Sequence, residues 1–310
     1  MKNYFGFTLT GKKLLPFWML MYGSILALYF VLFFVMRQSP FGASHAGIMP
    51  LILLLLMLLV YSLSFFLIKP ILNHIRYKEE ALSFDGTFGR FFGVLIGGML
   101  LTIITLGVYL AWYIRNVFRF FVDNTTLKGD AFSFKGTGGR LFLILLLSMV
   151  LPIALFSVVV VSMQAMHASS ELLVAGSVIY QLVMSFIMIP YMYLVYKWMT
   201  NVTYKHYTIQ WQTSFWSSIG KLFIEILLST ITLGIYAPFA FVRLYAYFIH
   251  RTVAQSDEAT RSFGFEPDPF NDFLFLWGQI LLTLVTLGIY YPWMICKVSS
   301  RFLGRTYLEL

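Results

Sequence analysis

Charged side chains stand at matching distances on both sides of a glycine in one apolar segment of this 310-residue chain. Glu225 lies nine residues before Gly234, and Arg243 lies nine residues after it. If the chain reverses at the glycine, both side chains lie about 13 Å from the turn and therefore at one depth. A carboxylate and a guanidinium at one depth can form an ion pair, the guanidinium can attract an anionic solute, and the carboxylate can accept a proton.

The spacing recurs around two other glycines, Gly288 and Gly107. The residues at or beside the matching positions are Glu225, Arg243, Gln279, Lys297, Asn116 and Arg115. We call these six residues the polar layer. Three interpretations stay open: polar contacts that hold helices together, arginines that extend toward the membrane surface, and a positively lined path for an anionic solute or lipid headgroup. Lys221, four residues before Glu225, is a rival partner, but we favour Arg243 because a Lys–Glu order is the weaker one on a helix.

Each glycine belongs to a repeated motif, TLGVY at 105–109 and TLGIY at 232–236 and 286–290. Gly107, Gly234 and Gly288 suit the left-handed end of a helix, and Pro238 and Pro292 suit the first turn of the next. The motif therefore predicts a tight helical hairpin at a membrane surface. Single kinked helices are the alternative, and they would reduce ten membrane segments to seven.

Aromatic residues follow each glycine: Tyr109, Tyr236, Tyr290, Trp112 and Trp293. Tyrosine and tryptophan are enriched where a membrane meets water, so we expect these side chains to form an interfacial belt. A threonine also follows each motif threonine by 20 residues, at Thr125, Thr252 and Thr306.

A second repeated pattern, with phenylalanines in alternation, starts near residues 5, 82, 132, 207 and 263. Alternation over five residues is typical of half-buried strands. These pieces either pair into a small sheet or lie as aromatic anchors at the membrane surface, and we favour partial pairing. The five predicted units are about 4–78, 79–128, 129–203, 204–258 and 259–310 of a single membrane domain. The predicted fold class is an all-α polytopic membrane protein with about ten membrane segments as five helical hairpins and short strand-like pieces on the cytoplasmic face.

Composition and charge indicate a membrane protein. The chain is 59% hydrophobic and 11% charged, with a mean hydropathy of +0.80, whereas soluble domains carry about 25% charged residues. Apolar runs at 14–36, 48–68, 141–163 and 172–196 are long enough to cross a bilayer. In the first and third units the predicted turns are longer loops, 37–47 and 164–171. Basic residues gather on the strand side and only Arg37 lies opposite, which predicts cytoplasmic N- and C-termini.

The TLGxYxPW turns, the basic residues after them and the phenylalanine-rich pieces resemble the YjgN-like family of bacterial inner-membrane proteins, a domain of unknown function. The resemblance extends along the chain, although Ala111 replaces the proline of the other two copies. It implies a multi-pass protein of the bacterial inner membrane and supplies no activity.

Several classes of function lack a sequence signal. Cys296 is the single cysteine, and the five histidines are scattered without metal-ligand spacing, so we expect no metal site and no cofactor. We find no catalytic constellation and do not expect an enzyme. Basic residues stand singly at the ends of apolar runs, which argues against nucleic acid. The oligomeric state cannot be read from the sequence.

The leading functional hypothesis is a transporter or channel-like protein for a small anionic solute or lipid, with membrane lipids as its surroundings. The rival is a membrane scaffold or envelope-organising protein without a translocation path, which predicts a fully paired polar layer. An enzyme acting on lipid comes third.

Overall fold

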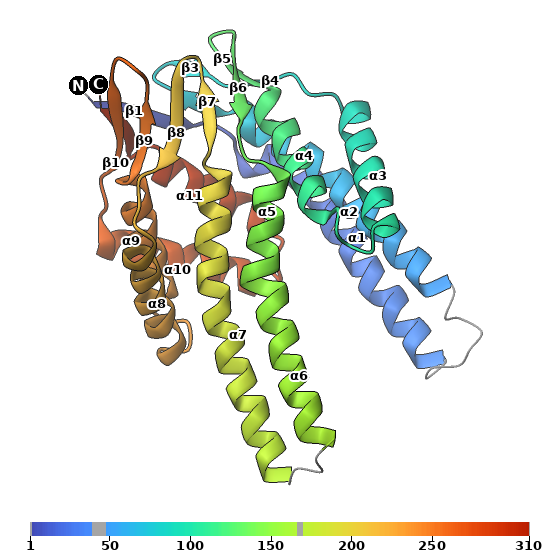
Figure 1. The fold of residues 1–310 in the computed structure, drawn as a ribbon. Helices are drawn as coiled ribbons and strands as arrows, with labels where there is room; N and C mark the ends of the chain where they lie inside the picture. Colours follow the sequence, from blue (N-terminus) through green and yellow to red (C-terminus); the bar gives the residue numbers. More distant parts are fainter. Residues whose placement is uncertain (1, 39–47, 166–169, 310) are drawn as a thin grey trace.

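The computed structural model describes residues 2–38, 48–165 and 170–309. Strands gather at one end of the molecule, helices extend from them, and both termini lie at the strand end (Figure 1). Residues 39–47 and 166–169 lie outside the described residues. They make up most of the two loops predicted at 37–47 and 164–171.

All strands in the described residues belong to one antiparallel sheet of eleven strands. They are β1 (Lys2–Phe7), β2 (Ile75–Tyr77), β3 (Glu80–Ala81), β4 (Ser83–Phe84), β5 (Thr125–Leu127), β6 (Asp130–Phe134), β7 (Val202–Tyr204), β8 (Tyr207–Trp211), β9 (Thr252–Gln255), β10 (Thr260–Phe265) and β11 (Thr306–Glu309). Their order is β3-β2-β1-β11-β10-β9-β8-β7-β6-β5-β4. The phenylalanine-rich pieces thus supply β1, β4, β6, β8 and β10, and the short segments after each helix pair supply strands between them.

The sheet is nearly closed into a barrel. Its two end strands, β3 and β4, are consecutive in the chain and are separated by Leu82 alone. Strand β1 pairs with both β2 and β11, which holds the two ends of the chain together. The all-α prediction is therefore wrong, because these strands form a continuous layer with its own interior rather than isolated surface pieces.

Hairpin turns between neighbouring strands contain residues in the left-handed backbone conformation. Lys128 (φ 56°) and Gly129 (φ 84°) join β5 to β6, as a two-residue hairpin loop requires. Lys78 and Lys205 take the same conformation in the turns after β2 and β7. These lysines lie at the barrel tips, where Lys205 Nζ is 2.8 Å from the carboxylate of Asp130 on the neighbouring hairpin.

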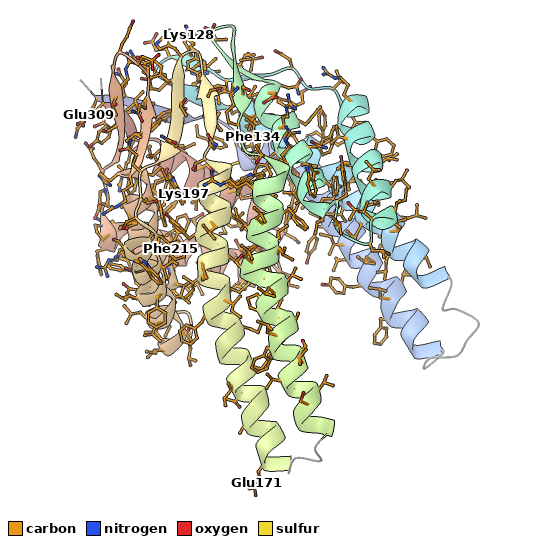
Figure 2. The ribbon with its side chains drawn as sticks, in the orientation of Figure 1. Lys128, Phe134, Glu171, Lys197, Phe215 and Glu309 are labelled. Atoms are coloured by element: carbon orange, nitrogen blue, oxygen red, sulfur yellow. The ribbon has the colours of Figure 1, made fainter. Side chains whose placement is uncertain are left out.

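The helices form five consecutive groups between the strands. They are α1 (Gly11–Gln38) and α2 (Ile48–Asn73); α3 (Phe88–Ile104) and α4 (Leu110–Asp123); α5 (Gly138–Leu145), the π-helical η1 (Leu146–Val150), α6 (Leu151–Ala165) and α7 (Ser170–Met199); α8 (Phe215–Ile231) and α9 (Ala237–Ile249); and α10 (Pro269–Val285) and α11 (Tyr291–Leu303). Figure 2 shows Lys128 at the strand end and Glu171 at the far end of α7.

Three stretches in the described residues are long and apolar enough to cross a membrane: Gly11–Phe33, Ile52–Asn73 and Gly138–Ser162. The prediction of ten membrane segments is wrong. Of the six helices around the TLG motifs, α3, α9 and α10 are apolar. All six have only 13 to 17 residues, fewer than the roughly 20 of a typical span. The three long stretches support membrane association.

The threonines 20 residues after each TLG motif mark the change from helix to strand. Thr125, Thr252 and Thr306 open β5, β9 and β11, and all three are buried. Each hydroxyl donates to the carbonyl oxygen four residues earlier, at 2.7, 2.9 and 2.8 Å respectively. The hydroxyl therefore satisfies a carbonyl at the end of the helix, where no further amide follows in register.

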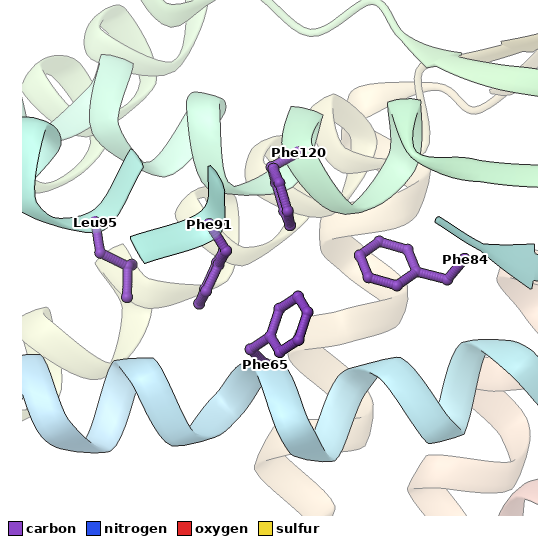
Figure 3. Packing of buried hydrophobic residues seen from close by; sticks show 5 residues of the cluster. All are labelled: Phe65, Phe84, Phe91, Leu95 and Phe120. Atoms are coloured by element: carbon purple, nitrogen blue, oxygen red, sulfur yellow. The ribbon is translucent and has the colours of Figure 1, made fainter. Parts of the chain in front are cut away.

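Phenylalanine side chains fill the junction between the helices and the strands. Phe65 of α2, Phe84 of β4, Phe91 and Leu95 of α3, and Phe120 of α4 form one buried cluster (Figure 3). Phe65 lies 5.5 Å from Phe91 and 6.0 Å from Phe84 between ring centres, within the range of favourable aromatic pairs. The cluster fixes the α3–α4 pair against α2 and the barrel edge.

Candidate functional site

The TLG motif forms the same turn in three helix pairs. In the α8–α9 pair, the backbone amide of Tyr236 donates to Thr232 Oγ1 at 3.1 Å. Leu233 and Gly234 both have positive φ, 51° and 87°. The corresponding threonines accept from Tyr109 and Tyr290 at 2.9 and 3.0 Å. The threonine thus satisfies the backbone amide of the tyrosine just before the second helix, and the chain reverses through two residues in the left-handed conformation.

Glu225 is the centre of the first polar cluster. Its side chain is completely buried, and Lys221 Nζ lies 2.6 Å from Oε1. The Tyr236 hydroxyl donates to Oε2 at 2.8 Å and accepts from Arg243 at 2.8 Å. Arg243 Nε is 3.5 Å from Oε1. Both cations pair with Glu225, and Lys221 rather than the favoured Arg243 is the nearer of the two.

A version of this cluster with a neutral amide in place of the acid occupies the α10–α11 pair. Tyr290 donates to Gln279 Oε1 at 3.0 Å and accepts from Lys297 Nζ at 2.8 Å. Gln279 is buried. The same tyrosine position therefore joins the two members of the polar layer in both helix pairs.

The α3–α4 pair has a reduced cluster. A side chain at Gly98 would meet the Tyr113 ring, so this pair has no group to match Glu225. Asn116 Nδ2 donates to the Tyr109 hydroxyl at 3.3 Å, and Arg115 donates to Asn116 Oδ1 at 3.0 Å. Arg115 Nε is buried without a hydrogen-bond partner.

The polar layer is thus three separate clusters, each inside one helix pair. In the part of the chain that the structure describes, no hydrogen bond or ion pair joins one cluster to another. A groove of about 370 Å³ beside Glu225 is lined mainly by apolar residues, including Phe241 and Leu244.

The bridging tyrosines were missed as members of the site. As members of the expected interfacial belt, Tyr236 and Tyr290 were assigned no hydrogen-bond partners in the polar layer. The sequence nevertheless contains a signal for these contacts. Each tyrosine lies 11 residues after the acid or amide and seven residues before the base. Fixed spacing of a hydroxyl to both polar positions is a pattern that a purely interfacial role does not require.

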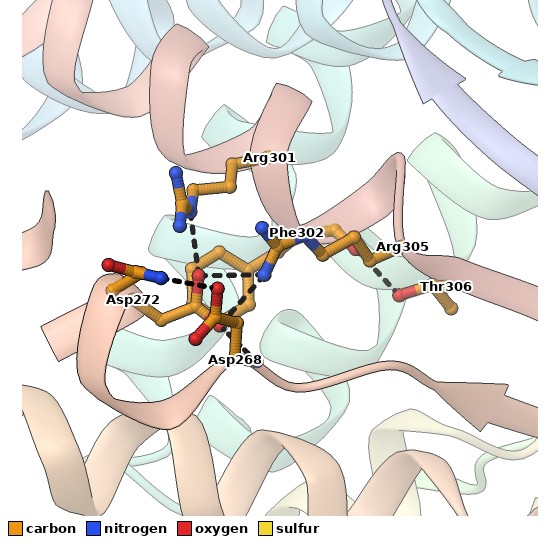
Figure 4. A network of polar contacts seen from close by, with 7 residues as sticks. Asp268, Asp272, Arg301, Phe302, Arg305 and Thr306 are labelled. Atoms are coloured by element: carbon orange, nitrogen blue, oxygen red, sulfur yellow. Dashed lines mark hydrogen bonds and ion pairs between the residues drawn. The ribbon is translucent and has the colours of Figure 1, made fainter.

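A further buried carboxylate lies outside the polar layer, near the start of α10. Asp272 is 1% exposed and contacts Arg301 Nε at 2.6 Å and Arg305 at 3.0 Å. Its Oδ2 also accepts from the backbone amide of Asp268 at 3.0 Å. Figure 4 shows the two guanidinium groups converging on this carboxylate. The network joins the start of α10 to the end of α11 and to Arg305 just before β11, and we assign it a structural role.

The barrel encloses a cavity of about 810 Å³ that continues between the barrel ends of α7 and α9. Its lining includes Phe5, Phe132 and Phe263 from the strands, and Trp211 and Phe248 near its helical end. The first phenylalanine of three strand pieces thus lines this space, whereas Phe7, Phe134 and Phe265 belong to buried clusters against the helices. No residue of the predicted polar layer lines this cavity; the groove beside Glu225 shares two lining residues with it, Phe241 and Leu244.

One guanidinium lines the barrel cavity. Arg261 lies over the Tyr207 ring, 4.8 Å from its centre. Tyr77 also lines the cavity; burial raises the pKa of its hydroxyl, and the charge of Arg261 partly opposes that rise. No ion pair of the described residues includes Arg261. The cavity therefore contains a positive charge whose neighbours are aromatic rings.

Asn3 adds an unsatisfied donor on the same face of the sheet. It pairs with Leu308, which in turn pairs with the cavity residue Phe263. Side chains directly across an antiparallel ladder lie on one face, so Asn3 belongs to the inner face. Its side chain is 7% exposed, and Nδ2 has no hydrogen-bond partner.

Residues 79–156, which include β4, the α3–α4 pair and the β5–β6 hairpin, match the family model described as a bacterial protein of unknown function (DUF898), the YjgN family. No curated protein and no solved structure matches the chain. Within the described ranges, no group of three or more His, Cys, Asp or Glu residues could hold a metal ion.

Proposed function

We propose that this protein binds an amphipathic lipid at a bacterial membrane, with the apolar chain inside the barrel and an anionic headgroup at Arg261. The observation that carries the proposal is the apolar cavity of about 810 Å³ within the sheet. Ligand sites in proteins span about 300–1,000 Å³ and are mainly apolar with a few polar groups. Apolar cavities of this kind exclude water and take apolar ligands.

The position of the charge supports a lipid over a fully apolar molecule. A guanidinium among aromatic rings, without a carboxylate partner, is a suitable donor to a carboxylate or phosphate. Asn3 Nδ2 provides a second donor on the same face that the protein leaves unused. Both residues lie toward the outer part of the barrel, so we place the headgroup there and the chain toward the helices.

The membrane orientation predicted from charge agrees with this arrangement. Lys78, Lys128 and Lys205 lie in hairpin turns at the barrel tips. We propose that the barrel and both termini lie on the cytoplasmic side, since basic residues concentrate there. The cavity then opens between helices that meet the inner leaflet, which supplies the lipid.

Conduction of a small anionic solute has less support. Each cluster of the polar layer is paired within its own helix pair, so the layer offers no continuous polar path. That pairing instead favours the second candidate, a scaffold without a ligand. The two candidates differ in one respect that can be measured: whether the barrel is occupied.

Lipid occupancy of the purified protein tests the proposal. The protein is extracted from bacterial membranes in mild detergent, and bound lipid is measured by native mass spectrometry. Ala254→Trp places a large ring in the cavity, since Ala254 is a lining residue. Ser262→Trp is the matched control, because Ser262 is exposed on the adjacent strand β10.

We expect about one lipid per wild-type chain, the same for Ser262→Trp, and at least a tenfold loss for Ala254→Trp. Arg261→Gln should retain apolar binding but lose the preference for anionic over zwitterionic lipid. An empty wild-type protein, or equal occupancy in both tryptophan variants, would reject the proposal and leave the scaffold.

A further inference from the structure

We infer that the three TLG turns lie inside the hydrocarbon core of the bilayer, as re-entrant tips whose partners are lipid acyl chains. The tips are residues 105–109, 232–236 and 286–290. This inference goes beyond lipid binding in the barrel and depends only on the membrane location proposed above.

Helix length places the tips within the bilayer. Helices α9 and α11 have 13 residues each, which is about 20 Å at 1.5 Å per residue. The hydrocarbon core is about 30 Å thick. In contrast, α1 has 28 residues and is about 42 Å long. Figure 1 shows α6 and α7 extending well beyond the tip of the α8–α9 pair.

Contacts with α1 locate one tip more closely. The Tyr22 hydroxyl donates to the carbonyl of Leu287 at 2.6 Å, and Trp18 Nε1 donates to that of Gly288 at 3.0 Å. Tyr22 is the central residue of the candidate span Gly11–Phe33. If α1 crosses the membrane, the tip of the α10–α11 pair therefore lies beside the middle of that span, whatever the tilt of α10 and α11.

The tips expose leucine where water would favour a polar residue. Leu106, Leu233 and Leu287 are 94%, 93% and 78% exposed. Each has φ near 50°, a conformation that costs an L-residue with a side chain about 1–2 kcal/mol. Glycine, asparagine or aspartate would adopt it more easily in water. A leucine at this position in all three turns is consistent with apolar surroundings.

The backbone of each tip satisfies its own donors, as hydrocarbon requires. In the α8–α9 pair, the amides from Thr232 to Ala237 all donate to acceptors in the same turn or helix, and Pro238 has no N–H. The corresponding amides of the other two tips, 105–110 and 286–291, are satisfied in the same way.

Side chains from neighbouring helices cover exposed carbonyls. Trp277 Nε1 of α10 donates to the carbonyl of Ile235 at 3.0 Å, as Trp18 and Tyr22 do at the next tip. A carbonyl facing water would need no such donor. The tryptophans therefore act as caps for polar groups that the bilayer could not solvate.

Site-directed labelling tests the depth of the tips. In a Cys296→Ser background, single cysteines replace Ile104, Ile231 and Val285, the exposed last residues of α3, α8 and α10. These positions lie just before each motif and avoid its left-handed residues. Lys128→Cys at a barrel tip and Glu171→Cys at the far end of α7 are the controls.

In reconstituted vesicles, a membrane-impermeant maleimide should label the two controls from opposite sides and none of the three test positions from either side. Nitroxides at the test positions should collide with oxygen far more often than with a polar nickel complex. Labelling of the test positions from the side of Glu171 would mean that the hairpins cross the membrane. Labelling from the side of Lys128 would mean that they lie on its surface. Either result overturns the inference.

Photolabelling of the wild-type protein gives a readout that no substitution can disturb. A phospholipid with a diazirine at the middle of its acyl chain should label peptides that contain Leu106, Leu233 and Leu287. A phospholipid with the diazirine in its headgroup should label these peptides far less. Tip labelling by the headgroup probe alone would contradict the inference, and neither result depends on occupancy of the barrel.

Discussion

Replacement of the tyrosine at the end of each TLG motif by phenylalanine removes one hydroxyl and keeps the ring. The three turns share their backbone geometry but differ in what the hydroxyl contacts. Tyr236 donates to a buried carboxylate and accepts from a guanidinium. Tyr290 donates to a neutral amide and accepts from an ammonium. Tyr109 only accepts, from Asn116 at 3.3 Å. Together the substitutions form a graded series with internal controls.

The expected losses follow from the charge of each partner. Hydrogen bonds to charged groups contribute about 1.5–3 kcal/mol and neutral ones about 0.5–1.5 kcal/mol. Glu225 keeps Lys221 after Tyr236→Phe, and the Arg243 side chain is 46% exposed, so we expect a loss of about 3 kcal/mol rather than the full sum. Tyr290→Phe should cost about 2 kcal/mol, and Tyr109→Phe below about 0.5 kcal/mol.

The free energy of unfolding is measured in mixed micelles by raising the mole fraction of SDS and following helix content by circular dichroism. The order of losses should be Tyr236, then Tyr290, then Tyr109. Equal losses in all three variants would contradict the dependence of the loss on the charge of the hydroxyl's partners. No loss for Tyr236→Phe would refute the bridging role of that residue.

Two further predictions concern ion pairs at the barrel. Asp272→Asn leaves Arg301 and Arg305 without a charge partner and should cost about 3 kcal/mol, at the low end for a buried pair because the two arginine side chains are partly exposed. In the same unfolding assay, Asp130→Asn, which breaks an exposed pair with Lys205, should cost far less. Similar losses in the two variants would contradict the structural role of Asp272. Hydrogen bonds from Lys2 and Tyr4 lower the pKa of Glu266 below its usual 4.5. The wild type should therefore be more stable than Glu266→Gln at pH 7. This difference should disappear as the pH falls through the folded-state pKa of Glu266, which lies below 4.5. A difference in stability that persists at pH 2 would rule out the proposed link between Glu266 ionisation and stability.

The TLG turn could be read from its residues, because its requirements are local. A left-handed glycine and a proline in the next helix have few other uses. The bridging hydroxyls required one more comparison, the fixed distance from each tyrosine to the acid or amide and to the base. The proposed membrane depth of the tips could not be read from hydropathy, since the 17-residue helix α10 is at least as apolar as the helix α1, which contains a candidate span.

The barrel could not be predicted because half of it is built from segments with little pattern of their own. The phenylalanine-rich pieces alternate clearly, whereas β5 (Thr125–Leu127) and β7 (Val202–Tyr204) have three residues each. Such short segments gain strand structure from their neighbours in the sheet. The cavity in turn exists only because β3 and β4 bring the two ends of the sheet together, so Arg261 could not be recognised as an interior residue.

A structure of the protein in lipid nanodiscs, at a resolution that shows side chains, tests the central claim most directly. We predict elongated density inside the barrel, along Phe5, Phe132 and Phe263, that ends in a headgroup at Arg261. A barrel without such density, or one whose cavity is closed by its own side chains, would contradict the claim that the protein binds an amphipathic lipid.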